Sequence, residues 1–275
     1  MRIIYILSSG HSGSTVLGAL LGNIKKSLHL GEFINFYKVY SGQLETCSCG
    51  ELPSECPFWS EIIKRFSKFL KSNNKTIEDY ETIRKIVENT ILKNETEIYA
   101  LDLYEEYTKK LFSIIEEVSG KKILIDSSKS PGRAYALSKI FNDHITIILL
   151  KRKYSGVIES YQRKREKLSM IKLLISLVKE HCKFVFVINK CNCKTKRINY
   201  EDIFSQEKTD EFARKTKIQK SIELRHKIFN KHVIAGNRLR YQPYFYLKRN
   251  ENHKSFYNLK EKFLIEIAEI SRKII

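Results

Sequence analysis

The sequence predicts an α/β protein with three layers, in which a central parallel sheet is flanked by helices. The chain opens with a strand-like run of β-branched and aromatic residues, Arg2–Leu7, followed by a serine- and glycine-rich loop and an apolar helix. Two further strand-like runs, Lys121–Asp126 and His144–Leu150, are each followed by a helical pattern. Strands that alternate with helices favour a parallel sheet with right-handed crossovers.

The length and composition favour a single domain over residues 1–275. The chain is 42% hydrophobic, and its 11 Gly and 4 Pro argue against long flexible linkers. The apolar run after Arg2 is too short for a secretory signal, and no later apolar stretch is long enough to span a membrane. We therefore expect a cytoplasmic protein with reduced cysteines and no transmembrane segment.

The first loop, Ser8–Thr15, predicts an anion site. A loop between a strand and a helix directs backbone N–H groups and a helix N-terminus at one point, where phosphate usually binds. Gly10 and Gly13 let the backbone approach the anion closely, and hydroxyl donors are supplied by Ser12, Ser14 and Thr15. The alternative is an ordinary turn before a helix. The position after the first strand favours the phosphate interpretation, which makes the expected fold P-loop-like.

The loop differs from that of nucleoside triphosphatases. Their loop has four residues between two glycines, and a lysine and a hydroxyl residue follow the second glycine. Here two residues separate Gly10 from Gly13, and no lysine follows Gly13. The spacing disfavours ATP and GTP, so a P-loop small-molecule kinase is only an alternative hypothesis.

The middle of the chain predicts a helical cap or insert at about residues 45–120. Before it, the extended segment Leu28–Phe33 carries Glu32, which is either a solvated or helix-capping carboxylate or a residue facing a ligand at the sheet edge. Cys47–Trp59 is rich in turn residues. Apolar residues then recur at helical spacing in Glu61–Lys71, Ile77–Leu92 and Glu97–Val118. We expect an acceptor molecule to bind beside these helices.

The second half of the chain continues the alternation of strands and helices. A helix is predicted over Arg133–Phe141, and His144–Leu150 is the most hydrophobic strand candidate. Lys183–Ile188 and Arg197–Tyr200 are further extended candidates, followed by a polar helical stretch. The end of the chain, Ser255–Ile275, predicts an amphipathic helix with one apolar side formed by Phe256, Leu259, Phe263, Ile267 and Ile270.

The net charge of +19 is concentrated in the second half of the chain. Residues 1–147 hold 19 Lys and Arg against 18 Asp and Glu, whereas residues 148–275 hold 31 against 13. A basic half suits an anionic cofactor, an acidic polymer, nucleic acid or a lipid surface, or it is simply a solvated surface. A non-enzymatic protein that binds polyanions is therefore a second alternative hypothesis.

The six cysteines do not predict a metal site. They form two groups, Cys47, Cys49 and Cys56, then Cys182, Cys191 and Cys193. Neither group has the Cys-x-x-Cys spacing of common zinc sites, and no histidine pair follows at the usual spacing. We expect no metal.

Two stretches together resemble the sulfotransferases that use 3′-phosphoadenosine 5′-phosphosulfate (PAPS), in particular their bacterial members. Ser9–Thr15 is similar to the loop that holds the 5′-phosphosulfate in that superfamily. Leu149–Tyr161 is similar to its 3′-phosphate motif, a strand that ends in arginine with a serine eight residues later. The resemblance implies that Arg152 and Ser160 bind the 3′-phosphate, and an arginine at a strand end can converge with a serine of the next helix on one phosphate.

Three further stretches extend the resemblance over most of the chain. Asp126–Lys129 resembles the Asp-Ser-Ser-Lys stretch of bacterial members, and Asn199–Ile203 resembles a Tyr-Glu-Asp-Leu segment that is mainly structural. His232–Arg240 resembles an element that closes over the cofactor. The resemblance implies that the residues of this element that bind the cofactor are Gly236, Asn237 and Arg240.

The implied reaction moves a sulfuryl group from PAPS to an acceptor hydroxyl and leaves 3′-phosphoadenosine 5′-phosphate. The 5′-phosphate would be bound by Gly10, His11, Ser12, Gly13, Ser14 and Thr15. His11, which stands where lysine or arginine is commoner, and Lys129 would stabilise the leaving group and the sulfuryl oxygens. Glu32 would be the catalytic base.

The acceptor follows only from analogy with related bacterial enzymes. It is expected to be a hydroxyl on a carbohydrate or glycolipid. Nucleic acid is not an expected partner, peripheral contact with a membrane is left open, and the sequence does not indicate the oligomeric state.

Overall fold

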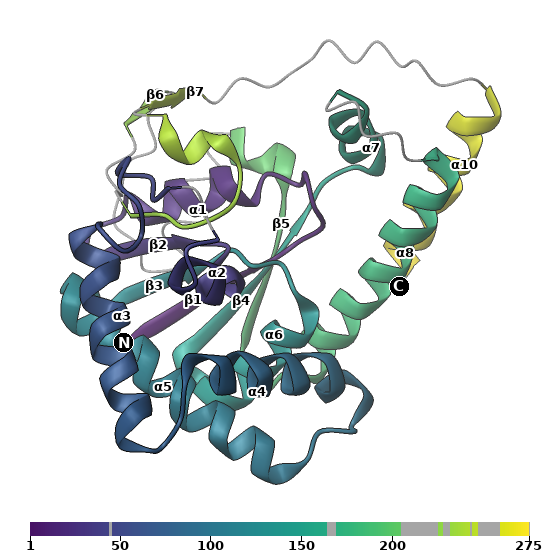
Figure 1. Cartoon of the computed structure of the whole chain (residues 1–275). Helices are drawn as coiled ribbons and strands as arrows, with labels where there is room; N and C mark the ends of the chain where they lie inside the picture. Colours follow the sequence, from purple (N-terminus) through teal and green to yellow (C-terminus); the bar gives the residue numbers. More distant parts are fainter. Residues whose placement is uncertain are drawn as a thin grey trace.

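A five-stranded parallel sheet forms the centre of the computed structural model (Figure 1). The structure describes residues 1–43, 46–163, 169–204, 225–227, 232–242, 244–246 and 259–274. The strands lie in the order β2-β3-β1-β4-β5. Their bounds are β1 Arg2–Leu7, β2 Ser27–Gly31, β3 Ile123–Asp126, β4 Ile145–Lys151 and β5 Lys194–Asn199. The predicted α/β class with a central parallel sheet is confirmed.

The first strand lies in the middle of the sheet. Tyr5 pairs with Asp126 of β3, and Leu7 pairs with Leu149 of β4. Because all five strands are parallel, their carboxyl ends meet at one edge. The chain leaves β1 for one side of the sheet and later returns to place β4 on the other side, which makes this edge the expected ligand position in an open α/β sheet.

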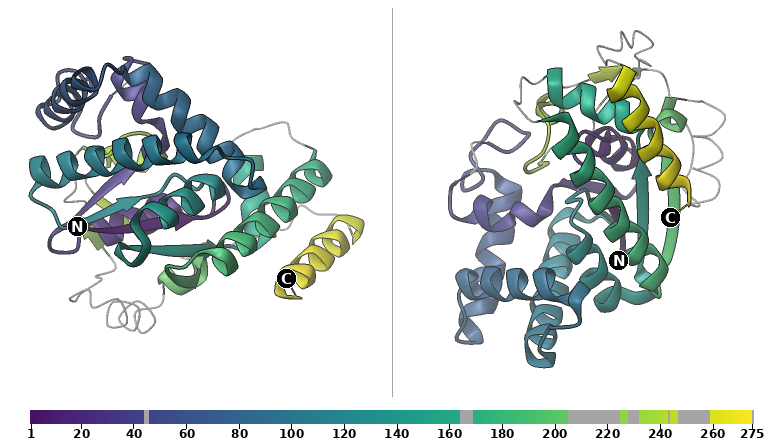
Figure 2. Two further views of the ribbon diagram at one scale, coloured as in Figure 1. Left: turned by 90° about the horizontal axis from the view of Figure 1, so that it is seen from below. Right: turned by 90° about the vertical axis from the view of Figure 1, so that its right-hand side faces the viewer.

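Alternating side chains of β1 divide the core into two layers. Ile4 and Ile6 pack against α1, whereas Ile3, Tyr5 and Leu7 face a larger cluster shared with other helices. Helices therefore cover both faces of the sheet (Figure 2). The helices are α1 Ser14–Gly22, α2 Phe36–Tyr40, α3 Pro57–Ser72, α4 Ile77–Thr90, α5 Ile98–Ser119, α6 Pro131–Phe141, α7 Tyr154–Arg163, α8 Met170–Lys190 and α10 Leu259–Ile274.

Short elements complete the chain. The 3-10 helices are η1 Phe33–Asn35, η2 Ile91–Lys93, η3 Asn142–His144, η4 Tyr200–Phe204 and η5 Arg238–Tyr241. A separate antiparallel pair is formed by β6 Arg225–Lys227 and β7 Tyr244–Tyr246.

The helical insert shares its core with one face of the sheet. Trp59 at the start of α3 is fully buried and lies 6.1 Å, between ring centroids, from Phe33. Phe33 in turn meets Phe112 of α5 edge to face at 5.5 Å. Offset and edge-to-face rings add to the stabilisation from burying apolar area. These contacts fix η1, which directly follows Glu32, against the insert.

One prediction for the second half was wrong, and one helix has an unexpected orientation. Lys183–Ile188, expected to be extended, lies within α8, where Phe184, Val187 and Ile188 are buried at helical spacing while Phe186 is exposed. A short apolar run does not distinguish a strand from a buried helix. The last helix is present as α10, but Phe263, Ile267 and Ile270 are exposed, whereas Ile265 and Ala268 are buried.

Helix α10 owes this orientation to its neighbours. Ile265 and Ala268 join a cluster with residues of α7 and α8, and α10 runs beside α8 in both figures (Figures 1 and 2). The polar helical stretch after Ile203 and the side chain of Phe256 lie outside the described residues. Within the described part of the chain, the helices are too short or too polar to cross a membrane.

Candidate functional site

The loop after β1 forms the centre of the candidate site. It runs from Ser8 to the first turn of α1, and His11 and Gly13 adopt positive φ angles of 59° and 88°. A Cβ on Gly13 would lie 2.3 Å from the ring of Tyr200, and a Cβ on Gly10 would lie 2.5 Å from the hydroxyl of Tyr161. Gly13 is therefore required by its positive φ and by the Tyr200 ring, whereas a side chain at Gly10 would displace the end of the Tyr161 side chain.

His11, Arg152 and Ser160 lie together. The Nδ1 atom of His11 is 3.0 Å from the Ser160 Oγ, and its ring packs on Tyr161 with centroids 4.1 Å apart. Arg152 Nη1 donates a hydrogen bond of 2.8 Å to the His11 carbonyl oxygen. The structure thus joins the two residues predicted for the 3′-phosphate to the loop, and it directs His11 at Ser160.

Arg152 is held by packing as well as by hydrogen bonding. Its guanidinium carbon lies 4.4 Å from the ring centroid of Tyr200, a cation–π contact. A Cβ on Gly156 would come within 2.9 Å of the Arg152 Nε atom, so α7 passes directly against this side chain. Burial lowers the pKa of Arg152, although an arginine remains charged at neutral pH. Sequence reasoning missed this role of Tyr200, which lies in a segment that the family resemblance identifies only as structural.

A pocket with several basic side chains adjoins Arg152. Burial and the nearby cations Arg197 and Arg272 lower the pKa of Lys151. Burial likewise lowers the pKa of His181 to about 4. The lining residues that carry polar or charged groups are Ser9, Ser12, Lys151, Arg152, Tyr154, His181 and Arg272. Excess positive charge that is partly removed from water favours an anion.

Glu32 and Lys129 form an ion pair at the ends of neighbouring strands. Glu32 follows β2, Lys129 follows β3, and the lysine Nζ donates to Glu32 Oε1. A Cβ on Gly236 would lie 3.7 Å from that oxygen and 3.9 Å from the Thr15 Oγ1. The predicted base, the predicted cation, the end of the loop and the C-terminal element therefore meet, and their side chains keep partial exposure of 22% for Lys129 and 26% for Glu32.

The turn that carries Lys129 is anchored by buried polar contacts. Asp126 accepts hydrogen bonds of 2.9 Å from both the Ser128 amide and Arg133 Nε. Ser128 Oγ accepts from the Ile34 amide at 2.8 Å, which connects this turn to the segment after Glu32. Arg133 also pairs with Glu88 of α4 at 2.8 Å. Arg133 Nη2 is buried without a hydrogen-bond partner among the described residues, but the other contacts of this network hold the turn that carries Lys129 beside Glu32.

Two further titratable groups lie against the site. His29 is buried, with Nε2 3.0 Å from Ser127 Oγ, and burial together with Lys129 lowers its pKa to about 3. Glu180 of α8 lies close to Ser9, and burial raises its pKa. Sequence reasoning missed Glu180 because its neighbourhood was not recognised as one long helix.

The C-terminal element reaches the site along the edge of β2. Ile234 forms a parallel bridge with Gly31, and its amide donates to the Leu30 carbonyl oxygen at 3.1 Å. Asn237 caps η5 by accepting from the Leu239 amide at 3.0 Å. Arg240 Nη1 donates to the Gly236 carbonyl at 2.7 Å. The structure therefore brings Gly236 to Glu32, while Asn237 and Arg240 stabilise the turn that carries it.

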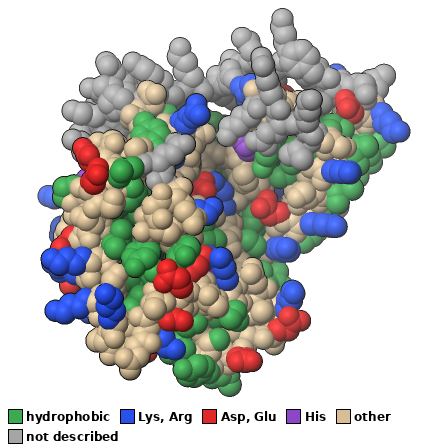
Figure 3. All heavy atoms as spheres, viewed as in Figure 1, with side chains coloured by type: hydrophobic (Ala, Val, Ile, Leu, Met, Phe, Trp, Pro, Cys, Tyr) green, Lys and Arg blue, Asp and Glu red, His purple; other side chains and the backbone are tan. Residues whose placement is uncertain are grey.

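The surface above the sheet is hollowed near its centre. The space-filling view shows side chains of both charges around this hollow (Figure 3). Mixed charge at the carboxyl edge of a parallel sheet suits a ligand that has anionic groups and a group that can be deprotonated.

Comparison with known proteins shows similarity to a solved structure but to no family model. No protein-family model matches, and no match was found among curated proteins. The sulfotransferase domain from the Synechococcus PCC 7002 olefin synthase is similar in structure, with a TM-score of 0.44 and 18% sequence identity. The similarity covers 80% of this chain and 74% of that domain.

Proposed function

We propose that this chain is a sulfotransferase that moves the sulfuryl group of PAPS to an acceptor hydroxyl. The observation that carries the proposal is the presence of two clusters at different points of one anion-binding loop. His11, Arg152 and Ser160 form the first cluster. Thr15, Glu32 and Lys129 form the second, together with Gly236. A cofactor that carries one phosphate away from its reacting sulfuryl group needs one cluster to bind that phosphate and another beside the transferred group.

The first cluster suits the 3′-phosphate of PAPS. Arg152 supplies a permanent charge with a planar set of donors. Its guanidinium donates to the His11 carbonyl oxygen, and the His11 ring contacts the Ser160 hydroxyl, so His11 connects the two residues. The adjoining pocket adds Lys151, whereas Arg272 pairs with Glu269 and donates to the Arg152 carbonyl oxygen at 2.6 Å. A nucleoside triphosphate carries its phosphates in one row and does not require a separate site of this kind.

The second cluster suits the chemistry. The bond between sulfur and the bridging phosphate oxygen breaks, a bond between sulfur and the acceptor oxygen forms, and the acceptor proton moves to Glu32. Lys129, which donates to Glu32, can instead donate to the sulfuryl oxygens as charge develops there. The loop amides with Ser12, Ser14 and Thr15 bind the 5′-phosphate that leaves.

The rival functions lack support from specific residues. A P-loop kinase requires a lysine after the second glycine of its loop, and Ser14 stands there. A polyanion-binding protein would use the basic second half of the chain without any need for Glu32 or the Asp126 network. We place the acceptor hydroxyl on a carbohydrate or glycolipid, in the cytoplasm or at a membrane surface.

The test compares the thermal stability of the protein with different nucleotides. We expect 3′-phosphoadenosine 5′-phosphate to raise the melting temperature, because a ligand that binds only the folded state stabilises it. ATP with magnesium is the control and should have a smaller effect. No shift with the bisphosphate, alongside a shift with ATP and magnesium, would contradict the proposal. Acceptor pools incubated with labelled PAPS would then identify the acceptor class.

A further inference from the structure

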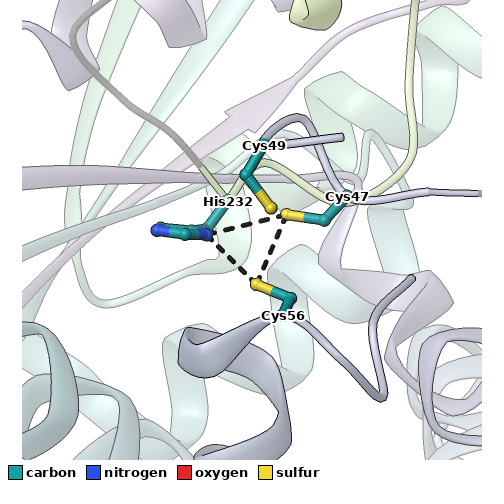
Figure 4. Close-up of side chains that lie close together, drawn as sticks. All are labelled: Cys47, Cys49, Cys56 and His232. Carbon is teal, nitrogen blue, oxygen red and sulfur yellow. Dashed lines mark hydrogen bonds between the residues drawn. The ribbon is translucent and has the colours of Figure 1, made fainter. Parts of the chain in front are cut away.

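Three cysteines and a histidine from distant parts of the chain meet beside the C-terminal element. The ligand atoms of Cys47, Cys49, Cys56 and His232 all lie within 4.8 Å of one another (Figure 4). The three cysteines belong to the turn-rich insert before α3, whereas His232 lies 176 residues beyond Cys56. Sequence spacing could not identify this group, because the fourth member is not near the others in sequence.

The distances match those of a tetrahedral metal site. The Cys47 and Cys56 sulfurs are 3.8 Å apart, and His232 Nδ1 is 3.1 Å from the Cys56 sulfur and 3.8 Å from the Cys47 sulfur. Zinc bonds of about 2.3 Å to sulfur and about 2.0 Å to nitrogen, at tetrahedral angles, separate two sulfurs by about 3.8 Å and sulfur from nitrogen by about 3.5 Å. A disulfide would instead need two sulfurs at about 2.0 Å and would leave the third thiol and the imidazole without a function.

The surrounding backbone fixes the positions of the cysteines. The turn Cys47–Gly50 is closed by a hydrogen bond of 3.0 Å from the Gly50 amide to the Cys47 carbonyl, and Gly50 takes a φ of 99°. Cys56 is the residue directly before α3, so its position is set by the start of that helix.

The histidine is oriented by contacts that leave Nδ1 directed at the sulfurs. Its ring stacks on Phe58 with centroids 5.1 Å apart and planes inclined by 23°. Trp59 Nε1 donates to the His232 carbonyl at 2.9 Å. Cys47 and Cys56 are completely buried, so the four side chains can enclose an ion on all sides.

We propose that Cys47, Cys49, Cys56 and His232 bind one Zn²⁺ ion in a closed structural site. Three thiolates and one imidazole are a common ligand set for structural zinc, and four protein ligands leave no open position for catalysis. Thiolate-rich tetrahedral sites disfavour magnesium and calcium, which prefer oxygen ligands.

The zinc would connect the insert to the segment from His232 to Gly236, which lies beside Glu32. Beyond His232, the Val233 amide donates to the Ser48 Oγ at 2.8 Å, Ile234 joins the edge of β2, and Gly236 lies beside Glu32. An ion that fixes His232 therefore limits the movement of Gly236, four residues later. This consequence depends on the proposed function, whereas the binding of zinc does not.

The experiment measures metal on the full-length protein purified with a reducing agent. Elemental analysis should give one zinc per chain. Replacing zinc with Co²⁺ alone should give the intense visible bands of tetrahedral cobalt and a near-ultraviolet band from thiolate ligands. Wild-type protein that holds neither metal after reconstitution, or whose Cys47 and Cys56 are joined by a disulfide under reducing conditions, would overturn the proposal.

Variants test which residues bind the metal. Cys56→Ser and His232→Ala should lose most of the zinc, whereas Cys182→Ser is the matched control, because Cys182 is an exposed cysteine elsewhere on α8. Equal zinc content in Cys56→Ser and Cys182→Ser would contradict the assignment. If Cys56→Ser does not fold, the cobalt spectrum of the wild type still shows whether thiolates bind the metal. A zinc-loaded protein that does not bind 3′-phosphoadenosine 5′-phosphate would refute only the proposed function.

Discussion

Replacing Arg152 with alanine tests whether the site recognises two separate phosphates. Arg152 is partly buried, donates to the His11 carbonyl and packs on Tyr200. Under the proposed function, its free donors bind the 3′-phosphate of the cofactor. We expect Arg152→Ala to weaken the binding of 3′-phosphoadenosine 5′-phosphate far more than that of adenosine 5′-phosphate, which lacks the 3′-phosphate.

The magnitude follows from the type of contact. A hydrogen bond to a charged group contributes about 1.5–3 kcal/mol, and each 1.4 kcal/mol is about a tenfold change in Kd. The Kd of the bisphosphate should therefore rise about 10- to 150-fold. Loss of the His11 contact also disturbs the loop that holds the 5′-phosphate, so the Kd of adenosine 5′-phosphate should rise by a smaller factor. The ratio of the two Kd values isolates the 3′-phosphate contact.

Isothermal titration calorimetry at fixed salt measures both ligands. Lys153→Ala is the matched control, since it removes the same charge from an exposed neighbour of Arg152, and exposed charges contribute little. Equal weakening of both ligands by Arg152→Ala would refute the assignment of the 3′-phosphate. Equal effects of the two variants on the bisphosphate would indicate general attraction of anions, as the polyanion-binding hypothesis expects.

Two other predictions concern the titratable groups of the site. Glu32→Gln should lower kcat about 10²- to 10⁴-fold, the usual contribution of a general base, and should leave the Kd for 3′-phosphoadenosine 5′-phosphate unchanged. Glu180→Gln is the control for this variant. A loss of turnover limited to Glu180→Gln would assign the base to α8 instead. His29, whose pKa burial lowers to about 3, binds a proton more readily in the unfolded chain. The stability it contributes is therefore complete above the unfolded pKa and is lost as the pH falls from about 6.5 towards 3, by at most about 1.4 kcal/mol per pH unit. Urea denaturation at several pH values measures how the free energy of unfolding changes with pH. This dependence should be shallower for His29→Gln than for the wild type, whereas the exposed His144→Gln should match the wild type. Equal pH dependence in all three proteins would contradict this account.

The candidate site was predictable where a local pattern carries the chemistry. The run from Arg2 to Thr15 has a strand, two glycines and five serine or threonine residues, so the position of the loop follows from backbone propensities alone. The most hydrophobic strand candidate likewise is β4, and Arg152 follows it directly. Residues that end parallel strands must share one edge of the sheet, which is why Glu32 and Lys129 could be expected near the loop.

Contacts between distant segments could not be predicted in the same way. Glu180 meets Ser9 only because α8 packs along the sheet, and the run Lys183–Ile188 is compatible with a strand until its neighbours are known. Gly13 is required partly by the ring of Tyr200, which no spacing in the sequence indicates. Each of these contacts depends on how the layers pack.

The division between sequence and tertiary structure is clearest at the first loop and the cysteine cluster. By itself the sequence determined the loop Ser8–Thr15 between a strand and a helix of an α/β fold, because short-range backbone geometry creates such a loop, and it predicted an anion at that position. Only the tertiary structure decided that His11 lies against Ser160 and that His232 completes a group with three cysteines. Burial of apolar faces brings these segments together without regard to their separation in sequence. Side chains such as these acquire a common function only after the chain has folded.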